Sequence, residues 1–374
     1  MVYRALGIMS GSSLDGLDMA FVEFQKVSGK WSYSVKATAC YPYTKEWLAK
    51  LQTATTLPAR DYQLLNTAYG NYIGEQVNHF IQVNMVQYQV QLISSHGHTT
   101  FHIPSQRMTA QIGDGAAIAA LTGINVVSDL RSMDIALGGQ GAPIISIGEK
   151  LLWPEYSLLL NIGGIANISL NIDSTNIAFD ICPANRVLNL LANEVGKSYD
   201  EKGALAAIGT VQEELLNKLN ALDYYKQPYP KSLSNDFGTE IVWKLIKEEG
   251  YRKRDSVSWV QDALRTYVEH IGIQIENSIQ QVVSKHNPQT KNCKLLVTGG
   301  GAHNAFLIDR IKALIGQQGI EAVVPDQELI DYKEAIVMAL IGVLRWREEN
   351  NVLASVTGAL RNSIGGAVWI GQEA

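Results

Sequence analysis

The spacing of hydrophobic and polar positions predicts a chain in which strands and helices alternate. Its first third contains short apolar runs of strand length, and segment 61–86 places apolar residues three and four positions apart, as on one face of a helix. The strands expected here lie at 3–8, 19–24, 31–39, 89–95 and 124–128, with a short helix at 114–122 before the last. This alternation is typical of an α/β sheet.

The rest of the chain repeats one part of this pattern and is otherwise largely helical. Residues 158–170 again read as a strand, a glycine-rich turn and a strand, and a strand at 295–298 ends in a third glycine cluster. Helices are expected at 184–195, 199–208, 211–219, 239–248, 256–283 and from residues 304 and 329 onward. Short strands are expected at 322–324 and 367–370, and the last is expected to return to the first domain.

Composition and charge narrow the class of protein. A chain of 374 residues can form two domains, and its net charge of −5 gives no basic face, so nucleic acid is not expected as a partner. Three widely spaced cysteines favour reduced thiols and a cytoplasmic protein. The N-terminus lacks the pattern of a signal peptide, and the most apolar helix, 335–344, is too short to cross a bilayer, so no membrane partner is expected.

Three glycine clusters predict a site for the phosphates of ATP. The first is an N-terminal turn between two strands, where glycine, serine and aspartate present backbone N–H groups and hydroxyls to an anion. An ordinary hairpin turn is the alternative, but it seldom needs so many such residues. The candidate phosphate-binding residues are Gly11, Ser12, Ser13, Leu14, Asp15, Gly16, Leu17, Asp18, Gly163, Gly164, Gly299, Gly300, Gly301 and Asn304. Asp15 and Asp18 are expected to orient the first turn or to hold Mg²⁺ through water.

The order of these clusters predicts a duplicated actin-like (ribonuclease H-like) ATPase fold of the α/β class. Two domains with a nucleotide cleft between them are expected. Residues 1–130 with 355–374 would form the N-terminal domain, which carries the first phosphate hairpin. Residues 131–354 would form the C-terminal domain, which carries the second hairpin and the Gly-Gly-Gly turn. The glycine-rich loop 138–143 is the expected hinge or crossover.

Asp180 has two interpretations that the residues alone do not separate. It lies shortly before Pro183 and a predicted helix, where an aspartate often serves as a cap. It would equally suit a carboxylate at the end of a strand, placed to accept a proton.

The histidines of segment 96–102 also have two interpretations. His96, His98 and His102 could form a metal site, but contacts to a small polar ligand are favoured, because no matching zinc spacing occurs elsewhere. Residues 196–198 resemble the end of a P-loop, yet Leu191 stands where that motif needs glycine. Trp346 is expected in the core.

Taken together, these motifs resemble the anhydro-N-acetylmuramic acid kinase family. The similarity covers nearly the whole chain in family order. Its segments are 7–18, 95–97, 111–114, 129–131, 134–143, 160–167, 230–232, 299–301 with Asn304, 334–335 and 355–358.

The resemblance implies a specific reaction and specific roles. Such enzymes use ATP and Mg²⁺ to open the 1,6-anhydro bond of anhydro-N-acetylmuramic acid by hydrolysis and to phosphorylate O6. The product, N-acetylmuramic acid 6-phosphate, belongs to recycling of the bacterial cell wall. By this resemblance Asp180 is the catalytic base. The expected sugar-binding residues are His96, Thr99, Asp129, Asn185 and Glu334, and a homodimer is expected.

Some positions depart from the family pattern. The family has Asp-Thr-Gly-Pro-Gly-Asn where this chain has Asp-Ile-Cys-Pro-Ala-Asn at 180–185, and His98 replaces a glutamine. Asp180 and Asn185 are retained, which predicts an active enzyme. Two alternatives stay open: a kinase of a different sugar, or an actin- or chaperone-like ATP-binding protein that phosphorylates no sugar. The residues that would bind the lactyl carboxylate are not identified from the sequence.

Overall fold

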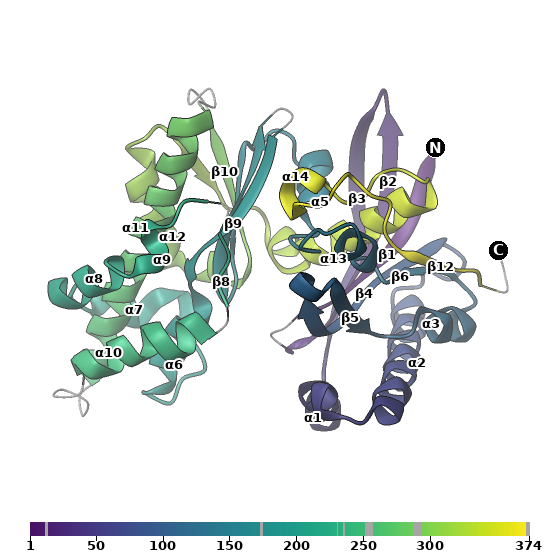
Figure 1. Ribbon diagram of the computed structural model, residues 1–374, viewed down its shortest axis with the longest axis horizontal. Coiled ribbons are helices and arrows are strands. Elements are labelled where there is room, and N and C mark those ends of the chain that lie inside the picture. The colour runs from purple at the N-terminus through teal and green to yellow at the C-terminus, as the bar shows by residue number, and fades with distance from the viewer. Residues whose placement is uncertain are drawn as a thin grey trace. The chain divides into compact units, whose positions relative to one another are not determined.

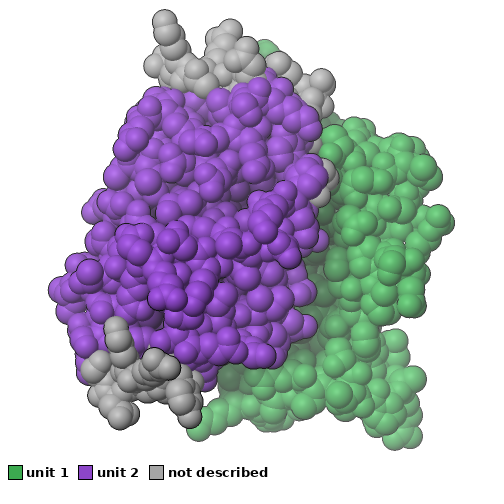
Figure 2. Space-filling view, turned by 60° about the vertical axis from the view of Figure 1, so that its left-hand side comes forward, with its two compact units in different colours: residues 1–154, 332–374 green, residues 155–331 purple. Residues whose placement is uncertain are grey.

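A computed structural model describes residues 1–11, 14–172, 175–229, 231–234, 236–250, 257–286 and 293–371. The chain forms two compact units, shown in different colours in Figure 2. Unit 1 comprises Met1–Pro154 and Tyr332–Ala374, and unit 2 comprises Glu155–Asp331.

Unit 1 contains a seven-stranded sheet within the described residues, in the order β12-β6-β4-β1-β2-β3, with β5 paired to β4 (Figure 1). Its strands are β1 (Val2–Ser10), β2 (Gly16–Val27), β3 (Lys30–Pro42), β4 (Leu92–Ile103), β5 (Met108–Ile112), β6 (Asn125–Ser128) and β12 (Ala367–Trp369). The first three strands are antiparallel, whereas β4 runs parallel to β1 and to β6. The final strand, β12, pairs with β6, which confirms that the chain returns to the first sheet.

Unit 2 contains a five-stranded sheet within its described residues, in the order β11-β10-β7-β8-β9. Its strands are β7 (Leu158–Ile162), β8 (Ile165–Ile172), β9 (Thr175–Pro183), β10 (Lys294–Thr298) and β11 (Glu321–Val323). Again three consecutive strands are antiparallel, and β10 is parallel to β7 and β11.

The two sheets therefore repeat one topology. Strands β3-β2-β1-β4-β6 of unit 1 correspond in order and direction to β9-β8-β7-β10-β11 of unit 2. An antiparallel meander extended by parallel strands is the ribonuclease H-like arrangement, so the predicted duplicated actin-like fold is confirmed.

Helices cover the sheets of both units. Those of unit 1 are α1 (Lys45–Thr53), α2 (Ala59–Val83), α3 (Gly115–Thr122), α4 (Ser132–Ala136), α5 (Ser146–Leu152) and α14 (Ala354–Thr357). Those of unit 2 are α6 (Asn185–Asn193), α7 (Ala204–Ile208), α8 (Glu213–Asn220), α9 (Asp223–Lys226), α10 (Trp243–Gly250), α11 (Val257–His286) and α12 (Ala305–Gly316). Helix α13 (Gln327–Trp346) begins in unit 2 and continues in unit 1.

Helix α13 packs closely on β1 and β4, and this contact explains where the compact units divide. A Cβ atom at Gly7 would lie 1.9 Å from the carbonyl oxygen of Ala335, so the strand can approach the helix only because position 7 is glycine. A Cβ atom at Gly148 of α5 would likewise lie 2.4 Å from the Val337 side chain of α13. Segments 131–154 and 332–354, which the sequence analysis places in the second domain, consequently group with unit 1.

Two local expectations need correction. The strand expected at 89–95 begins at Leu92 and extends to Ile103, so it includes His102. Arg107, in a left-handed conformation (φ 55°), then turns the chain into β5, a strand that the sequence pattern does not predict. Trp346 is 43 % exposed and is not part of the core, since it lies in the last turn of α13.

Candidate active site

The first glycine-rich turn joins β1 to β2, as the sequence predicts. Ser10 pairs with Leu17 and Met9 with Asp18, so the turn is anchored by a regular ladder. Leu14 has a left-handed backbone (φ 58°), and its N–H donates to the Gly11 carbonyl at 3.3 Å. Ser12 and Ser13 lie outside the described residues.

The two candidate Mg²⁺ residues flank the start of β2. Asp15 is exposed, and its Oδ1 accepts the Gly16 N–H at 3.1 Å; Asp18 is half-buried within β2. No group of three or more His, Cys, Asp or Glu side chains in the described part of the chain could hold a metal. One or two carboxylates still suit Mg²⁺, because this ion keeps several waters and binds through substrate phosphates.

A buried relay of hydroxyls ends at His98, beside the first turn. The Tyr43 hydroxyl donates to Ser10 Oγ at 2.8 Å and lies 2.6 Å from the Tyr69 hydroxyl. Ser10 Oγ in turn lies 3.1 Å from Nδ1 of His98. Burial raises the pKa of Tyr43 to about 12, so its hydroxyl stays protonated and remains a donor.

His96 is fixed in one neutral form. Its Nδ1 is 2.9 Å from the Gly97 carbonyl, which accepts only from an N–H, and its Nε2 accepts from Arg131 Nε at 2.9 Å. Burial, followed by the charge of Arg131, lowers the pKa of His96 to about 3. With both ring nitrogens engaged, His96 offers no lone pair to a metal, which argues against the metal interpretation of this segment.

Glu334 lies near the carboxyl end of β1, since its neighbour Ala335 contacts Gly7. Burial raises the pKa of Glu334, while the nearby cations Lys333 and Arg131 lower it. Arg131 is itself deeply placed, and burial lowers its pKa to about 10. Lys333 forms an almost fully buried ion pair with Glu149 at 2.9 Å. Unit 1 therefore gathers a compensated set of charges around His96 and Glu334.

Thr99 and Asp129 are engaged by neighbours in unit 1. Thr99 Oγ1 accepts from Gln111 Nε2 at 3.4 Å across the β4–β5 pair. Asp129 has a left-handed backbone (φ 55°), and its carboxylate accepts the hydroxyl of Ser132 at the start of α4. Burial raises the pKa of Asp129.

In unit 2 the second and third glycine clusters come together around Asn185. Its backbone N–H donates to the Gly163 carbonyl at 3.0 Å, and its side-chain Nδ2 donates to the Ile162 carbonyl at 3.1 Å. A Cβ atom at Gly301 would lie 3.1 Å from Oδ1 of Asn185 and 2.3 Å from the Ile162 side chain. Gly300 is similarly close to Asn185. Residues far apart in the sequence thus form one glycine-lined surface, and Asn185 stabilises it.

The glycines of this surface differ in how much space they face. Gly299 has φ 81°, and a Cβ atom there would lie 2.8 Å from the Ile162 carbonyl oxygen. Cβ atoms at Gly163 and Gly164 would meet nothing closer than 3.5 Å and 3.6 Å, respectively. Asn304 follows the turn and caps α12, where its Oδ1 accepts the Leu307 N–H at 3.0 Å. Gly163 and Gly164 therefore have room for a ligand, whereas Gly299 is required by the fold.

Asp180 lies in β9 and is not a helix cap. Helix α6 begins at Asn185 and has no side-chain cap, and Asp180 Oδ2 instead accepts the Leu233 N–H at 2.9 Å. Burial raises the pKa of Asp180, and the hydrogen bond from Leu233 lowers it less. A half-buried carboxylate with a raised pKa, held by a neutral donor, is suited to take up a proton.

Several residues that contact these groups do not stand out in the sequence. Arg131 lies inside a family segment, and its pairing with His96 joins positions 35 apart. Lys231 and Leu233 contact Asp180 across larger gaps, 53 positions in the case of Leu233, and Tyr224 contacts it from 44 positions away. The segment 230–232 was the available signal; its Pro230 lies outside the described residues.

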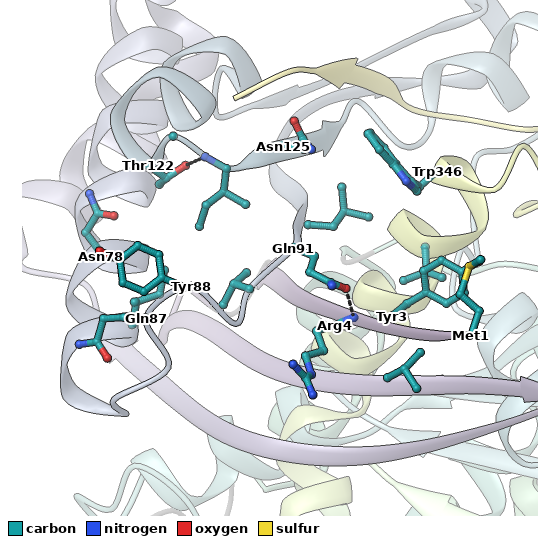
Figure 3. A pocket seen from close by; sticks show the side chains of 17 residues that line it. Met1, Tyr3, Arg4, Asn78, Gln87, Tyr88, Gln91, Thr122, Asn125 and Trp346 are labelled. Carbon is teal, nitrogen blue, oxygen red and sulfur yellow. Dashed lines mark hydrogen bonds between the residues drawn. The ribbon is translucent and has the colours of Figure 1, made fainter. Parts of the chain in front are cut away.

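A groove of about 850 Å³ in unit 1 contains none of the candidate residues. Figure 3 shows Arg4, Gln91, Asn125 and Trp346 lining it, with the Arg4 N–H donating to Gln91 Oε1 at 3.0 Å. These residues lie near the starts of β1, β4 and β6, whereas ligands of α/β sheets bind at the carboxyl ends. The groove is therefore separate from the candidate site of this unit.

None of the helices in the described ranges is long and apolar enough to span a membrane.

Known proteins resemble this chain over almost its full length. Residues 3–371 match the family model described as anhydro-N-acetylmuramic acid kinase. A protein of that name from Aliivibrio fischeri is 33 % identical over 378 residues, covering 98 % of this chain and 99 % of the relative. Another from Coxiella burnetii is 34 % identical over 384 residues, covering 99 % and 98 %.

Solved structures resemble it more distantly. The Acidaminococcus fermentans (R)-2-hydroxyglutaryl-CoA dehydratase component A gives a TM-score of 0.45 at 14 % identity, covering 91 % of this chain and 97 % of that one. A ROK family glucokinase from Streptomyces griseus, in complex with glucose and AMPPNP, gives 0.40 at 11 % identity, covering 91 % and 99 %. The family match and the near full-length relatives show that the chain belongs to the anhydro-N-acetylmuramic acid kinase family.

Proposed function

We propose that this protein is an ATP-dependent kinase that opens the 1,6-anhydro ring of anhydro-N-acetylmuramic acid with water and phosphorylates O6. The product would be N-acetylmuramic acid 6-phosphate, an intermediate of cell-wall recycling. Membership in the family supports kinase activity towards an alcohol acceptor. The observation that carries the proposal is Asp180, a half-buried carboxylate whose pKa is raised by burial.

Asp180 has the properties of the base for the hydrolytic half. It would accept a proton from the water that attacks the anomeric carbon. The bond from that carbon to O6 breaks, and O6 takes up the γ-phosphoryl group of ATP. Because the leaving oxygen is captured in this way, the second carboxylic acid of an ordinary glycosidase is less needed.

The glycine-lined surfaces are proposed to bind the nucleotide. In unit 2, Gly163, Gly164 and the turn 299–301 present backbone to a ligand, and Asn304 orders the helix that follows. In unit 1, the turn ending at Asp15 and Asp18 would serve the phosphates. Mg²⁺, held through water by these two carboxylates, would neutralise charge on the phosphates.

The sugar-binding residues are proposed from the family resemblance, and the chemistry of unit 1 supports Glu334 among them. Glu334 supplies a carboxylate acceptor for hydroxyl groups, and the nearby Arg131, whose Nε donates to the neutral His96, supplies a cation. Thr99 and Asp129 remain proposed contacts. The amide of Asn185 bonds the Ile162 carbonyl, which favours a role in shaping the phosphate surface over a direct sugar contact. A cytoplasmic location, where ATP is available, and a homodimer are also proposed.

A product assay tests the function. The protein is incubated with ATP, Mg²⁺ and anhydro-N-acetylmuramic acid, and the product is identified by mass. A gain of one phosphoryl group plus one water is expected. A gain of the phosphoryl group alone would show that the enzyme phosphorylates the sugar without adding water. ATP hydrolysis without any sugar phosphate, here and with a panel of other amino sugars, would favour the actin- or chaperone-like alternative.

A further inference from the structure

Asp180 lies in an edge strand at a bulge. Among the described strands of unit 2, β9 is outermost in the sheet, and none of them pairs with one side of its backbone. On the other side, Cys182 and Asp180 pair with the adjacent residues Ala166 and Asn167, which leaves Ile181 as an extra residue. Such bulges turn a side chain away from the regular pleat, so the direction of the Asp180 carboxylate depends on local contacts.

Those contacts form a closed ring of three hydrogen bonds. The Tyr224 hydroxyl donates to the Asp180 carbonyl at 2.7 Å, and the Asp180 N–H donates to the Lys231 carbonyl at 3.0 Å. Lys231 Nζ completes the ring by donating to the Tyr224 carbonyl at 3.2 Å, with the ammonium 4.5 Å from the centre of the tyrosine ring. The free edge of β9 is therefore held at Asp180 itself.

The ring also places the donor that contacts the carboxylate. Leu233 follows Lys231 by two residues, and its N–H donates to Asp180 Oδ2 at 2.9 Å. Among the described residues, none donates to the other carboxylate oxygen, Oδ1. A hydrogen bond to an ionised oxygen stabilises its charged form, so Oδ2 is the less available of the two for a proton.

Tyr224 is suited to hold this arrangement at all relevant pH values. Burial, followed by the charge of Asp180, raises the pKa of Tyr224 well above its usual value, so the hydroxyl remains a donor. The side chain is buried and packs against Tyr225 and Phe237.

We propose that Tyr224 is a positioning residue for the catalytic carboxylate, and that Oδ1 of Asp180 accepts the proton of the attacking water. Leu233 holds Oδ2, and the ring through Tyr224 and Lys231 fixes the backbone from which the carboxylate projects. The inference rests on the proposed function. In the step itself, water loses its proton to Oδ1 while its oxygen bonds the anomeric carbon. The bond to O6 breaks, O6 bonds the γ-phosphorus, and ADP leaves.

The chain offers a matched pair of variants. Tyr224→Phe removes the hydroxyl that contacts Asp180. Tyr225→Phe removes the neighbouring buried hydroxyl, which lies 3.0 Å from Nε2 of His270. The two tyrosines are similarly buried, 7 % and 9 % exposed. Each change therefore removes one buried hydrogen bond and keeps the aromatic side chain.

Steady-state kinetics and a solvent isotope effect separate positioning from general loosening. For Tyr224→Phe we expect kcat to fall about tenfold, since small displacements of a reacting group slow the chemical step strongly. KM for both substrates should stay within about twofold, and the isotope effect on kcat in D₂O should increase because proton transfer limits the rate more. Tyr225→Phe should retain the wild-type kcat and isotope effect.

The outcomes distinguish this inference from the function on which it rests. Equal losses in Tyr224→Phe and Tyr225→Phe, or wild-type kcat in Tyr224→Phe while Asp180→Asn is inactive, would overturn the positioning role and leave the proposed function standing. Normal turnover by Asp180→Asn would overturn the proposed base, and the inference with it.

Discussion

The two units share a strand order but differ in how their buried charged groups are paired. Around the carboxyl end of β1, unit 1 places Arg131 and Lys333 with Glu334 and Glu149, so that buried charges of both signs compensate one another. At the end of β9 in unit 2, the Asp180 carboxylate accepts a hydrogen bond from the uncharged Leu233 N–H, while Lys231 Nζ donates to the Tyr224 carbonyl and not to this carboxylate.

This difference in charge compensation is consistent with different proposed roles for the two units. Compensated charges with fixed protonation, such as the neutral His96, provide a rigid set of donors and acceptors for a polar ligand. A half-buried carboxylate whose pKa is raised by burial is less stable as an anion, and that makes it a stronger base. On the proposed function, the charged groups of unit 1 would contact the sugar, and the Asp180 carboxylate of unit 2 would take up a proton.

The largest expected effect comes from the carboxylate of unit 2. Asp180→Asn should lower kcat by about 10²–10⁴-fold, the range for loss of a general base, with ATP affinity within about twofold of the wild type. Steady-state kinetics measures kcat, and a nucleotide titration measures the affinity for ATP.

Asp134 of unit 1 provides the contrasting aspartate. It is 1 % exposed and accepts the Gly141 N–H and the Thr357 hydroxyl, each at 2.7 Å. Asp134→Asn should lower the free energy of unfolding by about 1–3 kcal/mol, because the amide must place N–H₂ against a donor. If Asp180→Asn lost stability and Asp134→Asn did not, the assignment of roles to the two aspartates would be wrong.

The next effect concerns the glycines of unit 2. Gly164→Ala should fold normally, because its Cβ meets only the Arg186 side chain at 3.6 Å, yet it should weaken ATP binding about tenfold by filling the ligand side of the turn. Gly299→Ala should instead lower the melting temperature, since its backbone has φ 81°. Thermal unfolding with and without ATP distinguishes the two, and unchanged ATP affinity in Gly164→Ala would contradict the phosphate role.

A smaller effect is expected for the stability of unit 1. Burial raises the folded-state pKa of Glu334 above its usual 4.5, so its protonated form is favoured in the folded protein. This group therefore supports the fold fully below pH 4.5, and that contribution is lost as pH rises through the folded-state pKa. Glu334→Gln should raise the melting temperature at pH 7 but not at pH 4. A lower melting temperature at pH 7 would show that its cationic neighbours outweigh burial.

The smallest effect is an expected absence of titration. With a pKa of about 3, His96 should show no protonation between pH 5 and 8 in its NMR spectrum. Titration of His96 near pH 6.5 would mean that burial and Arg131 do not hold it neutral.

The acid side of the kcat/KM profile should follow the ionisation of Asp180, with a pKa above the usual 3.8, because the base must be ionised.

Sequence reasoning succeeded where structure depends on local pattern. Both hairpins follow from short apolar runs that flank glycine-rich turns, and the helix at 59–83 follows from its periodicity. The sequence does not predict contacts between residues that are far apart along the chain. The bond from Leu233 to Asp180 joins residues 53 apart, and no spacing rule indicates it. Trp346 illustrates the same limit, because an apolar helix end indicates burial only if another element covers it.

In the proposed reaction, water activated by Asp180 attacks the anomeric carbon while O6 receives the phosphoryl group. A single turnover in H₂¹⁸O, quenched quickly and analysed by fragment mass, follows the oxygen of that water. We expect one ¹⁸O at the anomeric carbon and none in the bond from O6 to phosphorus, with no labelled product from Asp180→Asn. A label in the phosphoryl group, or an unlabelled sugar phosphate, would contradict it.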